Sequence, residues 1–170
     1  MVRAITHNDV NEIRSLGITL ETVAGHKGTS LIKDVIDKAV ENGITIVCFG
    51  GNETGKSTAL KTILSTIPVN AGTAIDGLKT EADVKLLKND DVKFAVLHAK
   101  DGVDAYDLIT CRSTEVSPNT VLIELVVDEN GHRAINGVSE IITVNNGKEN
   151  ALVPIVDIHK GRFRKLNDVV

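Results

Sequence analysis

The sequence predicts an α/β fold, in which a mostly parallel sheet flanked by helices ends in an antiparallel β-hairpin tail. Through residue 117, short β-branched segments alternate with segments of helical periodicity, as in strands joined by crossover helices. The run Ile-Thr-Ile-Val-Cys-Phe at 44–49 carries apolar side chains on both faces, so we expect a strand covered on both sides. After Pro118, strand-like segments are separated by turns that contain Asn-Gly, a strong hairpin signal.

The expected helices are set by apolar spacing and by the glycines that end them. In residues 30–42, apolar side chains recur on one helical face and Gly43 follows the last turn. Gly17 and Gly25 end two shorter helices, which make residues 1–28 an N-terminal helical segment. The predicted helices are 8–16, 19–24, 30–42, 57–67, 80–88 and 102–110.

The expected strands are short β-branched runs bounded by turn residues. Residues 44–49 and 92–98 are the clearest, and a Glu-Asn-Gly turn separates the two strands of the first hairpin. The predicted strands are 44–49, 73–76, 92–98, 120–128, 132–144, 151–158 and 162–166. We therefore expect one domain over residues 1–170, with an α/β body at 29–117 and a β-rich tail at 118–170.

Composition argues against several classes of function. The 170 residues carry a net charge of -4 and only four aromatic side chains, which gives no signal for nucleic-acid binding. No apolar run approaches the roughly 20 residues that a membrane span needs. Cys48 and Cys111 lie far apart and lack metal-ligand spacing, so we expect free buried thiols and a reducing, cytoplasmic location.

The basic run at 159–165 is the one cluster of positive charge in the sequence. Such a run is typical of an edge strand whose charges block aggregation. An anionic partner surface is the alternative interpretation.

One motif carries most of the chemical information. Residues 50–58 match G-x-x-x-x-G-K-[ST], and they follow a predicted buried strand and precede a predicted helix. In this arrangement backbone N–H groups and the helix N-terminus surround a phosphate, the lysine neutralises it, and the hydroxyl binds Mg²⁺. We therefore predict an ATP and Mg²⁺ site that contains Gly50, Gly51, Asn52, Glu53, Thr54, Gly55, Lys56, Ser57 and Thr58.

Two residues beyond the loop are candidates for the same site. Such loops use an acid at the end of a neighbouring strand to hold Mg²⁺, and Asp76 is the available carboxylate, although Asp-Gly is also a common turn. His98 ends a predicted strand, where α/β folds place their ligands, so it is either a γ-phosphate sensor or a structural histidine. We interpret Glu53 as a solvated charge at the tip of the loop.

With these residues in place, the chain resembles the type II/IV secretion (traffic) ATPase superfamily, the hexameric motors of conjugation, secretion and pilus assembly. The resemblance runs through most of the chain in the family's order. It is carried by 18–23 (family pattern "lTLedLv"), 40–60 with 67–68 ("av..g.nilv.GgTGSGKTTlL…ip"), 94–99 with Ala105 ("aTvHA…dAl"), and 127–133 with 138–141 ("rd.dG.R…vtEi").

The resemblance implies a RecA-like P-loop fold with ATP and Mg²⁺ as cofactors, and it matches Lys56 and His98 to family positions. With the acid that the loop itself calls for, the predicted catalytic residues are Lys56, Asp76 and His98, and the predicted metal ligands are Ser57 and Asp76. The resemblance also implies a homo-oligomer, a hexamer in the family, that works with secretion or transfer machinery in the cytoplasm or at the inner face of the membrane. The family's acidic segment and its G-E-[IL]-R motif have no match here, since residues 76–79 read Asp-Gly-Leu-Lys. We therefore expect ATP binding with weak or degenerate hydrolysis, with an active ATPase motor and a non-enzymatic interaction subunit as the alternatives.

Overall fold

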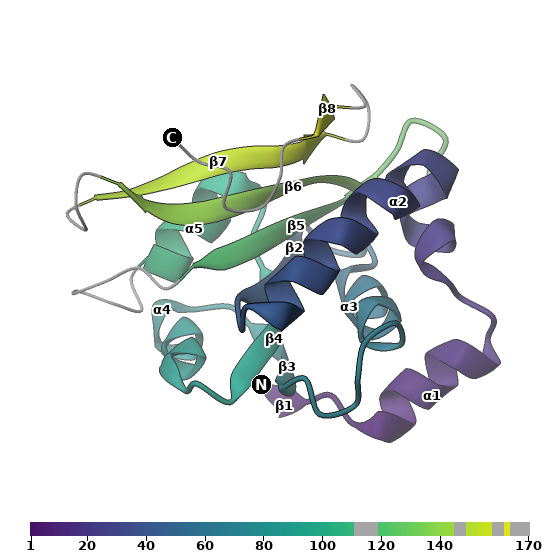
Figure 1. Cartoon of the computed structure of the whole chain (residues 1–170), viewed down its shortest axis with the longest axis horizontal. Helices are drawn as coiled ribbons and strands as arrows, with labels where there is room; N and C mark the ends of the chain where they lie inside the picture. The colour runs from purple at the N-terminus through teal and green to yellow at the C-terminus, as the bar shows by residue number, and fades with distance from the viewer. Residues whose placement is uncertain (111–118, 145–148, 158–161, 164–170) are drawn as a thin grey trace.

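The structure is a computed structural model, and it describes residues 1–110, 119–144, 149–157 and 162–163 (Figure 1). Cys111, the Asn146-Gly147 turn and the side chains of the basic run 159–165 lie outside the described residues. The helices are α1 (His7–Ser15), α2 (Leu20–Glu41), α3 (Lys56–Leu64), α4 (Glu81–Val84), the 3-10 helix η1 (Lys85–Lys88) and α5 (Gly102–Thr110). The strands are β1 (Arg3–Ala4), β2 (Thr45–Gly50), β3 (Thr73–Leu78), β4 (Val92–His98), β5 (Thr120–Val127), β6 (Arg133–Val144), β7 (Glu149–Asp157) and β8 (Arg162–Phe163).

The described strands form one sheet in the order β1-β3-β4-β2-β5-β6-β7-β8. The predicted α/β class is confirmed, but the prediction of a mostly parallel sheet is wrong, because three neighbouring pairs are parallel and four are antiparallel. The parallel part is the inner set β3, β4, β2 and β5. On one side, β6 pairs antiparallel with β5, and β7 and β8 follow it in turn, so the tail extends the same sheet. At the other edge, β1 adds an antiparallel strand.

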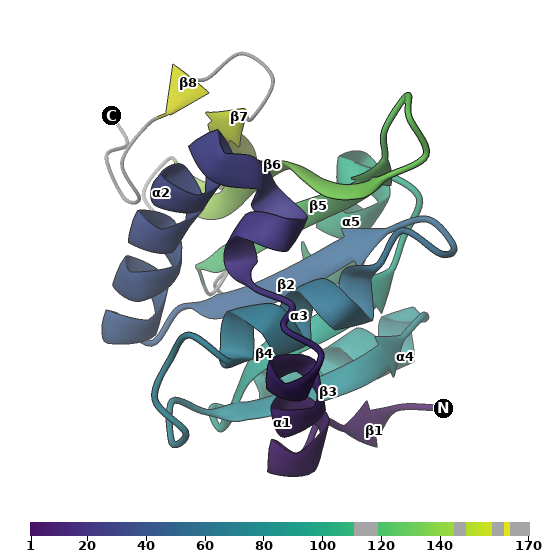
Figure 2. The same cartoon turned by 90° about the vertical axis from the view of Figure 1, so that its right-hand side faces the viewer.

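Helices cover both faces of the parallel strands and bury a separate core on each. Figures 1 and 2 show α1, α2 and α3 on one face, and α4 and α5 on the other. Side chains of β2 alternate between the two cores: Ile46 and Cys48 pack with α2 and α3, whereas Val47 and Phe49 pack with α5. All six residues of β2 are buried, as the apolar run predicted. Burial also raises the pKa of the Cys48 thiol, as expected for an unreactive core residue.

The long helix α2 combines two predicted helices. Gly25 has φ 75° and ψ 168°, which is not helical, so the chain bends at the glycine where the first helix was predicted to end. The predicted start of the second helix at residue 30 is wrong, because helical structure resumes directly after Gly25. The Thr29 hydroxyl donates to the Gly25 carbonyl at 2.8 Å, a side-chain bond to the carbonyl four residues earlier of the kind that accompanies bent helices.

Other differences from the predicted elements are small. The helix predicted at 80–88 divides into α4 and η1, and its start is fixed by a capping box between Thr80 and Asp83. The two-residue strand β1 was not predicted, because so short a segment has no periodicity to detect. No helix in the described ranges has the length and apolar character needed to cross a membrane.

The end of β2 lies close to the backbone of β5. A Cβ added to Gly50 would stand 2.6 Å from the Leu125 carbonyl oxygen and 2.6 Å from the Thr54 hydroxyl. At Gly51, the next residue, an added Cβ would meet no atom within 4 Å. Glycine is therefore required by packing at the first position and not at the second.

We expect Gly50→Ala to lower the free energy of unfolding by about 1–3 kcal/mol, the usual cost of overpacking. Gly51→Ala is the matched control and should change it by less than about 0.5 kcal/mol, as for substitutions that create no contact. Urea denaturation of the two variants without nucleotide gives both values. Equal destabilisation by the two substitutions would contradict the close approach of β5.

Candidate phosphate-binding site

The glycine-rich segment joins the carboxyl end of β2 to α3. In the sheet, β2 lies between β4 and β5, so the chain first moves to one side of β2 and later crosses to the other. Ligands of α/β proteins bind outside the strand ends at such a reversal of strand order. The loop of residues 51–55 thus occupies the position in this fold that best suits ligand binding.

The loop closes around the side chain of Lys56. The Lys56 ammonium donates to the Gly51 carbonyl at 2.8 Å, and the Thr54 hydroxyl donates to the same carbonyl at 3.1 Å. Gly55 is the N-cap of α3 with φ 83°, and since it has no side chain it cannot cap the first N–H groups of the helix itself. Those N–H groups are therefore available to an anion.

Lys56 is a buried cation. It is 5% exposed, and among the described residues it forms no ion pair with a carboxylate. Burial lowers the pKa of Lys56 below its ordinary value; nearby Asp76 opposes this shift and Lys79 adds to it. A phosphate in the loop would supply the negative charge that the described part of the protein does not place against this ammonium.

Asp76 reaches the loop from β3. Its carboxylate is 7% exposed, and its Oδ2 accepts a hydrogen bond of 2.6 Å from the Ser57 hydroxyl. Asp76 lies inside β3 and not in the turn that the Asp-Gly pair also allowed. The structure thus brings together the two residues that the sequence put forward as metal ligands.

His98 is the last residue of β4, the strand that pairs with β3, and it lies near Asp76. Its Nε2 lies 4.0 Å from the Asp76 Oδ1, which is too long for a hydrogen bond. Burial lowers the pKa of His98, Lys56 and Lys79 lower it further, and Asp76 opposes them without reversing the shift. His98 is therefore neutral at pH 7, and its contact with Asp76 is not an ion pair under that condition.

Ser57 and Asp76 are suited to hold Mg²⁺ in the way that protein oxygens do in nucleotide sites. Mg²⁺ keeps several waters and takes one or two protein oxygens together with phosphate oxygens. Ser57 and Asp76 supply such oxygens, whereas the described residues contain no group of three acidic, histidine or cysteine side chains able to hold a metal by themselves. The donor set therefore suits a metal that arrives with a phosphate ligand.

The remaining predicted loop residues lie further from this centre. Asn52 and Glu53 are exposed, and Glu53 has φ 59°, in the left-handed region that favours glycine. This placement agrees with the interpretation of Glu53 as a solvated charge. Thr58 follows Ser57 in the first turn of α3 and is half-buried. Glu81, which with Glu53 is a sequence candidate to assist Asp76 in an active ATPase motor, is exposed in the first turn of α4.

Sequence reasoning assigned no role to two cations that lie near the loop. Lys79 stands close enough to Lys56 and His98 to lower the pKa of both. Arg133 crosses Gly55, since a Cβ added to that glycine would lie 3.1 Å from the Arg133 Cδ. Lys79 could have been found from its position three residues after Asp76. Arg133 matches the arginine of the family pattern at 127–133, but nothing local marks its contact with Gly55, because that contact joins segments that are far apart in the sequence.

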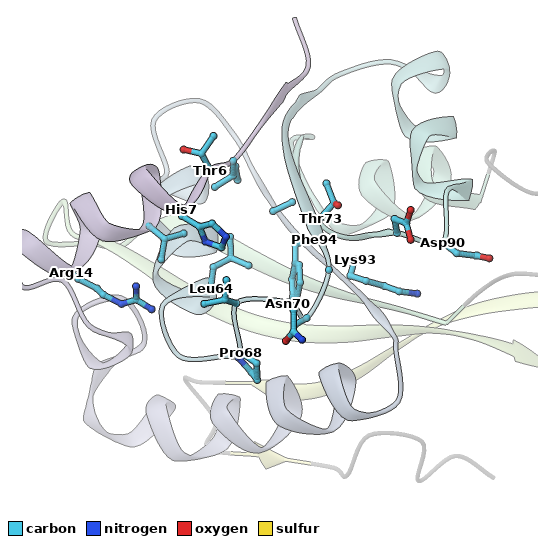
Figure 3. A pocket seen from close by; sticks show the side chains of 17 residues that line it. Thr6, His7, Arg14, Leu64, Pro68, Asn70, Thr73, Asp90, Lys93 and Phe94 are labelled. Carbon is cyan, nitrogen blue, oxygen red and sulfur yellow. The ribbon is translucent and has the colours of Figure 1, made fainter.

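A separate cleft of about 720 Å³ lies between α1 and the amino ends of β3 and β4 (Figure 3). His7 and Arg14 line it from α1, and Thr73 and Lys93 line it from the two strands. It shares no lining residue with the loop and lies at the opposite ends of the parallel strands. The glycine-rich loop and this cleft are therefore distinct regions of the structure.

Comparisons with known proteins do not place the chain in a family: no protein-family model matches it, and no curated protein is significantly similar to it. The functional argument consequently rests on the geometry of residues 50–58, Asp76 and His98.

We expect the lowered pKa of His98 to make the protein less stable as the pH falls. Below the unfolded-state pKa of about 6.5, the unfolded chain binds this proton before the folded protein does, so stability is lost from about pH 7 down through the folded-state pKa. The denaturation midpoint of the wild type should therefore fall more steeply with decreasing pH than that of His98→Gln. His7→Gln, which removes an exposed imidazole, is the control and should follow the wild type. Parallel curves for wild type and His98→Gln would contradict this prediction.

Proposed function

We propose that this protein binds ATP with Mg²⁺ at residues 50–58 and hydrolyses it slowly or not at all. The observation that carries the proposal is the 2.6 Å hydrogen bond from the Ser57 hydroxyl to the Asp76 carboxylate, beside the buried Lys56. A glycine turn without a ligand would have no reason to hold a buried ammonium and a buried carboxylate next to the open end of a helix.

Each residue has a role that follows from its position. The loop N–H groups and the first turn of α3 would surround the phosphates, and Lys56 would exchange the Gly51 carbonyl for phosphate oxygens. Ser57 and Asp76 would hold Mg²⁺, which neutralises charge on the phosphates when bound. His98, neutral and next to Asp76, is positioned to exchange a hydrogen bond with the terminal phosphate or with water.

The strand order supports a RecA-like interpretation of the parallel core. The loop follows β2, the acid Asp76 lies on β3, and His98 ends β4, which separates β3 from β2 in the sheet. Loop, acid and histidine therefore lie near the same ends of the parallel strands. Together with the sequence resemblance to secretion ATPases, this favours a cytoplasmic protein that self-associates, as a hexamer by analogy, and that joins secretion or DNA-transfer machinery.

The proposal of slow hydrolysis rests on the acids around the loop. An efficient ATPase needs a group to orient and polarise the attacking water. Gly77 follows Asp76 where the family has a glutamate, and the candidate replacements Glu53 and Glu81 are both exposed. Loss of one such group costs orders of magnitude in rate.

Lys56→Ala should weaken ATP·Mg binding at least about tenfold, since it removes a charged donor from the phosphates. Lys61→Ala is the matched control, because it removes the same side chain from the last turn of α3. Calorimetric titration gives both affinities. Equal affinity of wild type and Lys56→Ala would overturn the assignment of the loop. A melting temperature of the wild type that ATP·Mg leaves unchanged would instead indicate an interaction subunit with a relic loop.

The second candidate, an active ATPase motor, is favoured by the position of His98 beside Asp76. Steady-state phosphate release separates the two. We expect turnover far below the ~1–100 s⁻¹ typical of phosphoryl-transfer enzymes. Turnover in that range in wild type, abolished in Asp76→Asn, would establish the motor and overturn the proposal of weak hydrolysis.

A further inference from the structure

Arg133 lies across the glycine that starts the phosphate-binding helix. Measured from a Cβ built on Gly55, the Arg133 Cδ, Cβ and Cγ stand at 3.1, 3.4 and 3.7 Å. The aliphatic part of the side chain therefore runs along the N-terminus of α3. Because Cδ is bonded directly to the guanidinium nitrogen Nε, that nitrogen lies one bond length from an atom that borders Gly55.

The β5–β6 hairpin holds Arg133 in this position. Arg133 is the first residue of β6 and pairs with Val127, the last residue of β5. The turn between them is closed by Asp128, whose Oδ1 accepts hydrogen bonds from the backbone N–H groups of Asn130 at 2.9 Å and His132 at 2.8 Å. The arginine therefore starts from a hydrogen-bonded turn and not from a free loop. Figure 2 shows the turn that joins β5 to β6.

The face of the strand directs the side chain toward the loop. Ile135 belongs to the core that β6 shares with α2 and α3, and Arg133, two residues earlier, lies on the same face. A bulge at Asn136, whose amide donates to the Glu124 carboxylate at 2.7 Å, sets this register independently of the rest of β6. On the face of β6 that buries Ile135, Arg133 therefore lies beyond the core and next to Gly55.

The chemistry of the site suits a second cation at this point. Arg133 is exposed, and within the described residues it forms no ion pair, so its donors are free for a ligand. In loops of this kind the backbone N–H groups at the glycine and lysine hold the α- and β-phosphates, whereas the lysine side chain reaches the β- and γ-phosphates. An arginine whose Cδ borders Gly55 is therefore within reach of the part of the ligand that ATP and ADP share.

We propose that Arg133 is a ligand-binding residue that contacts the α/β-diphosphate of a nucleotide bound in the loop, supplied by the same chain through its β-hairpin. This inference rests on the proposed nucleotide-binding function. It identifies the recognised group as a diphosphate, so ATP and ADP depend on Arg133 alike and AMP does not. Guanidinium groups suit this task because they offer several donors in one plane to phosphate oxygens.

The test is calorimetric titration of the full chain with ATP·Mg, ADP·Mg and AMP. Arg133→Ala should weaken ATP and ADP binding by similar factors of at least about tenfold, as expected for loss of a charged hydrogen bond, and Arg133→Lys should recover part of the loss. Lys88→Ala is the charge-matched control, since η1 ends before β4 begins, at the strand ends opposite the loop. The melting temperature without nucleotide verifies that each variant is folded.

The possible outcomes separate this inference from the proposed function. If wild-type protein binds neither ATP nor ADP, the proposed function itself fails. If wild type binds both and Arg133→Ala binds them equally well, the arginine only covers Gly55 and the inference is overturned. A loss for ATP alone would place the guanidinium at the γ-phosphate and overturn the diphosphate assignment.

Discussion

The central constraint on this fold is that β2 must be buried on both faces and paired along both edges at once. Its alternating side chains need two apolar layers, and the helices on opposite faces of the sheet supply them. Its edges need β4 and β5, which the chain provides by moving to one side and then crossing over. The reversal of strand order next to β2 follows from this arrangement. The loop that follows β2 therefore lies where neighbouring connections leave the sheet in opposite directions.

A second constraint is electrostatic. Burial of Lys56 and Asp76 removes both side chains from water, and each needs partners that replace the lost hydration. The Gly51 carbonyl and the Ser57 hydroxyl serve as those partners in the protein. One partner lies in the loop and the other in the first turn of α3, so the charges and the backbone around them stabilise each other. Burial lowers the pKa values of both Lys56 and His98, and the positive charge of nearby Lys79 lowers both further.

Sequence patterns predicted local features well and non-local ones poorly. Residues 92–98 and 102–110 were predicted with the bounds that the structure gives, because a clear apolar pattern is bounded by residues that end it. The loop was placed between its strand and helix by a motif whose spacing has a chemical reason. The antiparallel pairing of β5 with β6 was predicted from the turn between them. The parallel pairing of β5 with β2, which joins both parts into one mixed sheet, was missed because nothing within β5 shows it. The approach of Arg133 to Gly55 was missed for the same reason, since register across a sheet is a property of the whole fold.

The hydrogen bond from Lys56 to the Gly51 carbonyl has a consequence for the energetics of ligand recognition. The Gly51 carbonyl accepts the hydrogen bond of the Lys56 ammonium that a bound anion would accept in its place. The same bond holds the loop curved in the absence of a ligand. Little conformational entropy is then lost on association, which is the benefit of preorganisation. The same bond has to be exchanged, so the net affinity is the difference between two competing acceptors for one ammonium. In the proposed function, a ligand would have to exceed this peptide oxygen as a partner of the ammonium, which would favour dense negative charge over merely polar groups.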